Sequence, residues 1–220
     1  MTKKNLLVLG GSGGVGQWLV KLAVEQGYNV TMLIRASSRY VAPQGVEVIV
    51  GDVLDTNVLT QALKGQDAVV SALGIMRVKP NNPWSALASP PDLMTQVAQN
   101  LVSAMKAQSV ERVVAISAAG VAESESQMSV ALKLLIRSSN VRKTFADFSH
   151  MEDTFAQSGL DTLSIRPVGL VDKNSQRAVG IVDKFNLGDQ ISKRDVAHWM
   201  LQALDRPNKF AVRTEMIGWT

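Results

Sequence analysis

The sequence of 220 residues predicts an α/β fold in which a doubly wound parallel β-sheet carries helices on both faces. Short apolar segments alternate with segments of helical apolar spacing along the chain, which is the pattern of strand–helix–strand units. The apolar segments are continuous runs, as is typical of strands that are buried on both faces. A cluster of glycines, Gly10–Gly16, lies between the first apolar run and the first helical segment. We therefore expect one domain that spans residues 1–220.

The first half of the chain contains four expected strands and three expected helices. The first strand, Asn5–Leu9, ends at the glycines, and the helix that follows ends at Gly27. The helix is predicted because Trp18, Leu19, Leu22 and Ala23 recur at helical spacing. The other expected strands are Val30–Ile34, Val46–Val50 and Ala68–Leu73, and the other expected helices are Asp55–Leu63 and Asp92–Gln108.

The second half continues the alternation with longer interruptions. The expected strands are Arg112–Ile116 and Leu163–Ile165, and the expected helices are Phe145–Gln157 and Asp195–Leu204. Two segments, Val78–Pro91 and Gly120–Ser139, have no regular spacing, and we predict that they are loops that cover a ligand.

Composition excludes several classes of protein. The chain has no cysteine and only two histidines, His150 and His198, so disulfides and thiolate chemistry are excluded and we expect no metal site. The net charge of +4 is small, and the densest basic group is sparse, so we expect no nucleic-acid partner. That group consists of Lys133, Arg137, Arg142 and Lys143.

The lengths of the apolar runs indicate where in the cell the protein is expected. They are far shorter than the ~20 residues that span a bilayer, and the run Leu6–Leu9 is too short for a signal peptide. We expect a cytoplasmic protein without membrane contact that is a monomer or a small homo-oligomer.

The glycine cluster has the spacing G-x-x-G-x-x-G at Gly10, Gly13 and Gly16. Between a strand and a helix, such a loop brings backbone N–H groups and the positive end of the helix dipole to a diphosphate. Ser12, Gly14 and Val15 belong to the same predicted loop, which indicates a Rossmann-type dinucleotide site.

Three other interpretations of this loop were weighed. It also matches the G-x-S-x-G turn of hydrolases, in which the serine is the nucleophile. That serine normally follows several strands of the sheet, and here only one strand precedes it. A P-loop is excluded because no Gly-Lys-Ser/Thr follows. A glycine turn without a ligand remains open.

The end of the second strand indicates which dinucleotide binds. NAD-binding proteins usually place a carboxylate there for the ribose 2′-hydroxyl. Here Arg35 stands at that point, followed by Ser38 and Arg39, and a guanidinium pairs with phosphate. We predict NADP(H) in preference to NAD(H). The alternative is that both arginines are solvated loop residues.

At this point the chain resembles a known family over nearly its whole length. It is similar to the atypical short-chain dehydrogenase/reductases of the NAD(P)H-binding, NmrA-like group, most closely to the branch of flavin reductase and biliverdin-IXβ reductase. The stretches that carry the resemblance are Gly10–Gly16, Thr31–Arg39, Gly51–Leu54, Gly65–Val70, Met151 with Ser158–Leu160, and Ile191–Val196.

The resemblance implies further site residues. Asp52 and Val53 would flank the adenine, and Leu73 and Gly74 would line the ribose side. Ser117 would stand near the nicotinamide, with Arg166-Pro167 beside it, and a small C-terminal portion from about residue 167 would cover the substrate. All of these positions follow expected strands, at the edge where open α/β sheets bind ligands. The alternatives are that Asp52 caps a turn and that the Ser117 hydroxyl bonds to backbone.

The usual Tyr-x-x-x-Lys pair of short-chain dehydrogenases is missing. Only Tyr28 and Tyr40 are present, without a lysine four residues later. Where the resemblance places the pair, the chain has Thr144 and Phe148. The flavin and biliverdin reductases have a histidine after the methionine, and here Glu152 follows Met151.

The missing acid favours hydride transfer to an acceptor that needs little acid help, such as a flavin or a quinone. Ser117 is the first candidate catalytic residue, and Glu152 and His150 are candidates for proton delivery unless they are only solvated. We predict an NADPH-dependent reductase. The alternative is a non-catalytic NADP(H)-binding redox sensor of the NmrA type, and a sugar-nucleotide epimerase is disfavoured.

Two apolar features have open roles. Met128–Ile136 is either an apolar wall over a flat acceptor or a packing or oligomer face. Trp84 either stacks on a ring system or is simply packed.

Overall fold

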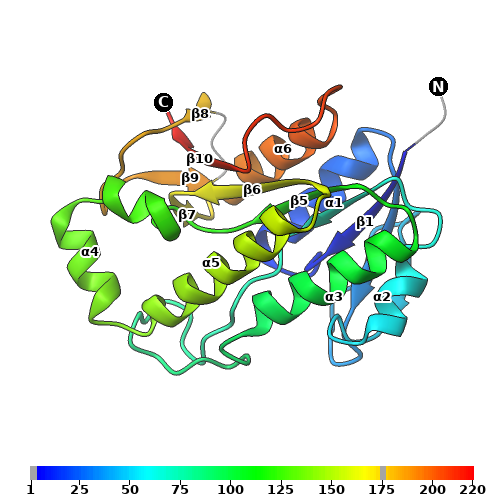
Figure 1. Ribbon diagram of the computed structural model, residues 1–220, viewed down its shortest axis with the longest axis horizontal. Helices are drawn as coiled ribbons and strands as arrows, with labels where there is room; N and C mark the ends of the chain where they lie inside the picture. The colour runs from blue at the N-terminus through cyan, green and yellow to red at the C-terminus, as the bar shows by residue number, and fades with distance from the viewer. Residues whose placement is uncertain (1–3, 174–176) are drawn as a thin grey trace.

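The computed structural model describes residues 4–173 and 177–220, so residues 1–3 and 174–176 of the expected 1–220 domain lie outside the described part. The described residues form an eight-stranded sheet in the order β3-β2-β1-β4-β5-β6-β10-β8 (Figure 1). All neighbouring strands from β3 to β10 pair in parallel, and β8 pairs antiparallel with β10. The strands are β1 (Asn5–Leu9), β2 (Asn29–Ile34), β3 (Glu47–Val50), β4 (Ala68–Ser71), β5 (Arg112–Ile116), β6 (Asp161–Pro167), β8 (Val179–Ile181) and β10 (Thr214–Trp219).

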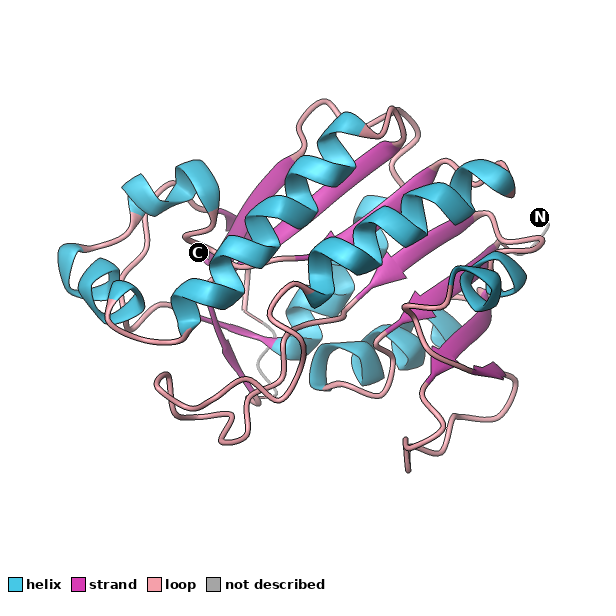
Figure 2. Cartoon of the chain, turned by 60° about the horizontal axis from the view of Figure 1, so that its bottom comes forward, coloured by secondary structure: helices cyan, strands magenta, loops and turns pink. Residues whose placement is uncertain are grey.

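Helices cover both faces of this sheet, which confirms the predicted fold class. On one face lie α1 (Gly14–Glu25) and α6 (Lys193–Leu204), and on the other α2 (Thr56–Ala62), α3 (Leu93–Ala107) and α5 (Val141–Gln157). Figure 2 shows long helices lying across the strands on one face. Strand β1 explains the continuous apolar runs, because Leu6 and Val8 pack in the core beneath α1 and α6 while Leu7 and Leu9 pack in the opposite core.

The strand order reverses at β1, which lies between β2 and β4. At such a point the loops that follow the two strands leave toward opposite faces and open a crevice at the carboxyl edge. Gly10, Arg35, Asp52 and Ala72 follow β1, β2, β3 and β4 respectively, so the topology brings them to one edge. Ser117 follows β5 at the same edge.

The prediction that Gly120–Ser139 is an irregular loop was wrong over most of its length. It contains a 3-10 helix, η1 (Ala122–Gln127), and an α-helix, α4 (Val130–Arg137), which lies at the end of the molecule away from β1 (Figure 1). Val130 and Leu134 of α4 are 82% and 69% exposed, whereas Ile136 is buried. The segment therefore does not form a closed apolar wall in this structure. Its helical spacing is hard to recognise because a helix of two turns buries so few residues.

The sequence predicted β6 at Leu163–Ile165 but did not reveal the strands that follow it. Strand β10 holds the buried Glu215, which breaks the apolar run but is satisfied by Arg206 and by the Trp199 indole N–H. A separate two-stranded sheet pairs β7 (Gly169–Val171) with β9 (Gln190–Ser192). These elements make up the predicted C-terminal portion from about residue 167, whose role in covering a substrate stays a prediction.

Among the helices of the described residues, each is too short or too polar to cross a membrane.

Candidate functional site

A cavity of about 320 Å³ opens at the carboxyl edge of the sheet, beside the reversal of strand order. Its walls come from the glycine loop, the ends of β2, β3 and β4, and the segment that leads into α3. The residues that were predicted to hold a cofactor and that line this cavity are Gly10, Ser12, Gly13, Arg35, Asp52, Val53, Leu73 and Gly74. Residues from four separate strand ends are thus brought to one cavity.

The glycine loop is shaped by close backbone contacts. The Gly13 N–H donates to the Gly10 carbonyl at 3.0 Å, and Gly10 adopts a φ of +73°. A Cβ on Gly10 would lie 2.7 Å from the Ala72 carbonyl carbon, and a Cβ on Gly16 would lie 2.1 Å from the Gly10 oxygen. Neither position accepts a side chain, so the tight turn into α1 depends on both glycines.

The first turn of α1 has the free donors that a diphosphate needs. Its N-cap is Gly13, and no side chain caps the helix. Helices α2 and α6 differ, because Asp55 and Ser192 accept hydrogen bonds from their first turns. Gly14, Val15 and Gly16 form the first turn of α1, and Val15 and Gly16 are buried. None of these three residues lines the cavity, but the N-cap Gly13 directly before them does. An uncapped first turn next to the cavity suits an anion there, and the loop fits the dinucleotide that the sequence predicts.

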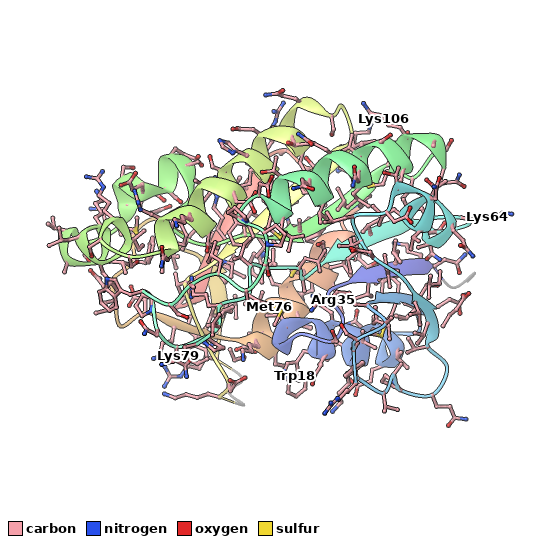
Figure 3. All side chains as sticks on the ribbon, turned by 90° about the horizontal axis from the view of Figure 1, so that it is seen from below. Trp18, Arg35, Lys64, Met76, Lys79 and Lys106 are labelled. Atoms are coloured by element: carbon pink, nitrogen blue, oxygen red, sulfur yellow. The ribbon has the colours of Figure 1, made fainter. Side chains whose placement is uncertain are left out.

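Arg35 extends from the end of β2 into the same cavity. Its Nη2 lies 3.6 Å from the Met76 sulfur, and Figure 3 shows the two side chains next to each other. The ion pairs found among the described residues do not include Arg35. Its guanidinium is therefore available to an anionic ligand.

The other predicted residues of this loop lie outside the cavity wall. The Ser38 N–H donates to the Arg35 carbonyl at 2.9 Å, and the Ser38 hydroxyl oxygen accepts from the Tyr40 N–H at 3.3 Å. Arg39 is exposed. Ser38 thus shapes the turn that carries Arg35, and a direct phosphate contact from Ser38 or Arg39 stays a prediction.

Asp52 has the turn-capping role considered for it, and it also lies at the cavity, where contact with an adenine stays a prediction. Its Oδ1 accepts from the Leu54 N–H at 2.9 Å, so it stabilises the turn before α2. The residue also lines the cavity together with Val53.

Ser117 lies at the carboxyl end of β5 and is buried. Its backbone N–H donates to the Ile165 carbonyl at 2.7 Å. Its Oγ, however, is enclosed and has no hydrogen-bond partner among the described residues, so the alternative of a hydroxyl bonded to backbone finds no support. A buried hydroxyl without a partner is costly and calls for a ligand or a water.

Thr144 shows the same feature on α5. Its Oγ1 is buried and has no partner within the described part of the chain. Phe148, one turn later, packs in the core between the sheet and α3. The two positions where the resemblance expects tyrosine and lysine therefore supply one hydroxyl and no cation.

Glu152 is placed differently from what the sequence suggested. Both of its oxygens accept hydrogen bonds from the buried guanidinium of Arg166, at 2.9 and 2.5 Å. Arg166 also bonds to Glu123, and the three groups hold η1, α5 and β6 together. These carboxylates raise the pKa of Arg166 further above its ordinary value, although burial opposes the shift. Glu152 is thus a structural partner of Arg166, and the geometry does not support it as a proton donor.

His150 and Pro167 are the remaining predicted residues. His150 is exposed and does not line the cavity, so its selection as a proton donor finds no support. Pro167 ends β6 in the buried sheet, and its carbonyl accepts from the Ala119 N–H at 3.0 Å. It therefore fixes the segment that follows Ser117.

The segment after β4, Val78–Pro91, has no helix or strand, as predicted, and an isolated antiparallel bridge between Arg77 and Leu87 folds it into a hairpin-shaped loop. Val78 N–H donates to Ala86, and Ala88 N–H donates to Met76. The Trp84 indole N–H donates to the Ser138 carbonyl at 3.1 Å, although the side chain is 56% exposed. The hairpin is thereby attached to the turn between α4 and α5. Stacking of Trp84 on a ligand stays a prediction.

Three positions near the site were not singled out from the sequence. Asp147 accepts from the Met94 and Thr95 N–H groups, so the first turn of α3 is already satisfied. Arg77 has a buried Nε without a partner among the described residues, and burial lowers its pKa. The Lys193 side chain lies against Gly14. Lys193 belongs to a stretch that carries the family resemblance, which was the only signal for it.

Comparison with proteins of known sequence agrees with this geometry. A 3-diazoavenalumate denitrifying reductase from a Streptomyces species is 34% identical over 116 residues, which are 52% of this chain and 38% of that protein. Eugenol synthase 2 of Clarkia breweri is 28% identical over 87 residues, 35% of this chain and 28% of its own. The matched region thus spans well under half the length of these relatives.

Solved structures match nearly the whole chain. A short-chain dehydrogenase/reductase from Veillonella parvula in complex with NADP has a TM-score of 0.78 at 16% identity, covering 99% of this chain and 95% of its own. The anaerobillin reductase ChuY of Escherichia coli O157:H7 has a TM-score of 0.77 at 19% identity, with 97% and 96% covered. At such identities the likeness shows the fold.

The family model described as NAD(P)H-binding matches residues 10–207, from the glycine loop to beyond α6. The matched region contains every residue that lines the cavity described above except Leu9. The chain belongs to the NAD(P)H-binding family.

Proposed function

We propose that this protein is an NADPH-dependent reductase that transfers hydride to a conjugated acceptor such as a flavin or a quinone. The observation that carries the proposal is the cavity that joins the glycine loop, up to the N-cap Gly13 of the uncapped helix α1, to Arg35. One end of this cavity suits a diphosphate, and the other offers a guanidinium where an NAD-specific site has a carboxylate.

Each part of the cavity has a separate task in this proposal. The backbone N–H groups after Gly13 hold the diphosphate, Arg35 holds the 2′-phosphate, and Asp52 with Val53 flanks the adenine. When bound, the reduced nicotinamide supplies a hydride. The unpartnered hydroxyl of Ser117, which is buried and does not line this cavity, then donates a hydrogen bond either to the nicotinamide carboxamide or to the acceptor.

The absence of an acid limits the acceptor. Thr144 and Phe148 stand where a tyrosine and a lysine would supply a proton, and Glu152 is occupied by Arg166. A threonine hydroxyl is too weak an acid to protonate an alkoxide, whereas a flavin or a quinone delocalises the incoming electron pair. Proximity of cofactor and acceptor is then the main catalytic contribution.

The named relatives support the reductase class. They include the Streptomyces denitrifying reductase and several isoflavone reductase homologues of plants. A non-catalytic NADP(H) sensor is the second candidate, and one relative favours it. The photosystem II assembly factor Ycf39 of Synechocystis is 32% identical over 69 residues, 21% of its length, and its name describes assembly rather than turnover.

An anaerobic stoichiometric reaction separates the two. The protein is mixed with NADPH and FMN, and the visible absorbance of oxidised flavin is followed with the absorbance of the reduced nicotinamide. A reductase consumes NADPH and FMN in a 1:1 molar ratio, at a rate that rises with protein concentration. Unchanged absorbance, together with a difference between the affinities for NADP⁺ and NADPH in a binding titration, would favour the sensor.

A further inference from the structure

The side chain of Lys193 crosses the first turn of α1. A Cβ built on Gly14 would lie 2.8 Å from its Cδ and 2.9 Å from its Nζ, so glycine at position 14 makes room for this lysine. The ammonium group therefore lies against the loop whose N–H groups face the cavity. The space needed by Lys193 explains why position 14 is a glycine. The G-x-x-G-x-x-G pattern does not explain it, because Gly14 is not one of its three spaced glycines.

This is an unusual place for a cation. Gly14 is the first residue of α1, so the ammonium of Lys193 lies at the partially positive end of that helix. A cation at such a point is unfavourable unless an anion lies beside it. In this structure the anion is Asp172, whose Oδ1 lies 2.6 Å from Nζ.

Asp172 is a weak partner for this role. Its side chain is 80% exposed, whereas that of Lys193 is 26% exposed. An ion pair with so exposed a carboxylate contributes little, because water solvates that carboxylate equally well when it is released. A phosphate oxygen at the first turn of α1 would satisfy the ammonium and the uncapped end of α1 together.

We propose that Lys193 binds the diphosphate of the dinucleotide and that the phosphate displaces Asp172 from the lysine. The proposal rests on the proposed function, since it assigns a further residue to the same cofactor site. It also gives β9 and α6 a part in binding, because Ser192 at their junction caps α6 and fixes the position of Lys193.

Binding of two ligands tests this assignment without any turnover. NADP⁺ carries the diphosphate and the 2′-phosphate, whereas adenosine 2′-monophosphate carries only the latter. Lys193→Gln should weaken NADP⁺ binding about tenfold or more, as expected for a lost charge-assisted contact. It should leave the affinity for adenosine 2′-monophosphate within about twofold, and Lys193→Arg should restore most of the NADP⁺ affinity.

Asp172→Asn tests the exchange itself. Removing the competing carboxylate should tighten NADP⁺ binding about two- to fivefold, and this gain should vanish when Lys193→Gln is present. Lys64→Gln, at an exposed position outside the cavity, is the matched control and should change neither affinity. Thermal unfolding of each variant without ligand checks that the fold is kept.

The outcomes separate the two proposals. Wild-type protein that binds neither ligand would overturn the cofactor assignment itself. Wild-type protein that binds both ligands, with Lys193→Gln losing nothing for NADP⁺ or losing equally for both ligands, would overturn the role of Lys193 alone.

Discussion

The Arg166 guanidinium donates to both oxygens of Glu152, Nε at 2.9 Å and Nη2 at 2.5 Å, inside the protein. Both side chains are nearly fully buried. This pair connects the middle of α5 to the carboxyl end of β6, the strand to which the Ser117 N–H is bonded. The pair therefore fixes α5 against the strand beside Ser117. It also engages the Glu152 carboxylate, which the sequence alone suggested for catalysis.

Removing the Glu152 carboxylate is expected to destabilise the protein. Glu152→Gln leaves a buried guanidinium with only the more exposed Glu123 as a charged partner, so we expect a loss of about 3 kcal/mol in the free energy of unfolding. Glu125→Gln breaks an exposed pair with Arg137 and should cost less than about 1 kcal/mol. Urea denaturation measures both. Equal small losses would show that the buried pair contributes no more than a surface one.

Glu123 gives this network a pH dependence. The hydrogen bond from Arg166 holds the pKa of Glu123 below its ordinary value of 4.5. A carboxyl whose folded pKa is depressed stabilises the protein above its unfolded pKa, and this contribution is lost as the pH falls through the folded pKa. The difference in unfolding free energy between wild type and Glu123→Gln should thus be largest near neutral pH and shrink below about pH 4.5. A difference that stays constant down to about pH 3 would contradict the assignment.

Because the Ser117 hydroxyl has no partner among the described residues, its removal is expected to lower the activity without lowering the stability. Ser117→Ala removes an unsatisfied polar atom, so the free energy of unfolding should stay the same or rise by up to about 1 kcal/mol. Turnover should fall about tenfold to a hundredfold if the hydroxyl bonds to nicotinamide or acceptor. Ser158→Ala is the control, because that hydroxyl bonds to Phe155 and Leu160 and its loss should cost about 1 kcal/mol. Full activity in Ser117→Ala would remove Ser117 from the mechanism.

Arg35 is expected to discriminate between the two dinucleotides. Arg35→Ala should weaken NADPH binding about tenfold to a hundredfold and leave NADH binding nearly unchanged, because only NADPH has the 2′-phosphate. Fluorescence titration of each cofactor measures this. Equal losses for both cofactors would contradict NADP(H) preference.

Gly16 is expected to be indispensable for the turn. A Cβ at this position would meet the Gly10 oxygen at 2.1 Å, so Gly16→Ala should cost about 2–3 kcal/mol and abolish cofactor binding. Gly188→Ala meets nothing within 4 Å and should be neutral or slightly stabilising. A stable Gly16→Ala variant that still binds NADPH would show that the loop adapts.

The parts of the fold that the sequence predicted are those with local signals. Strand β5 was expected at Arg112–Ile116 and has those bounds, because its apolar run is continuous and lies between the polar residues Arg112 and Ser117. Strand β10 was missed because the pairing of Glu215 with Arg206 and Trp199 is a tertiary contact with no local signature.

The candidate site shows the same division. Gly10 and Arg35 directly follow the ends of β1 and β2, so the fold class alone brings them together. Glu152 was selected by its neighbour in sequence, Met151, yet its chemistry is set by Arg166, fourteen residues away. Lys193 reaches the glycine loop only because α6 packs beside α1, which one sequence does not reveal.

The most direct test of the central claim is steady-state oxidation of NADPH by the wild-type protein, with FMN and then a quinone as acceptors and NADH in parallel. The account predicts turnover with NADPH that exceeds turnover with NADH by about tenfold or more for the same acceptor. Binding of NADPH without oxidation by any conjugated acceptor would contradict it and identify the protein as a sensor.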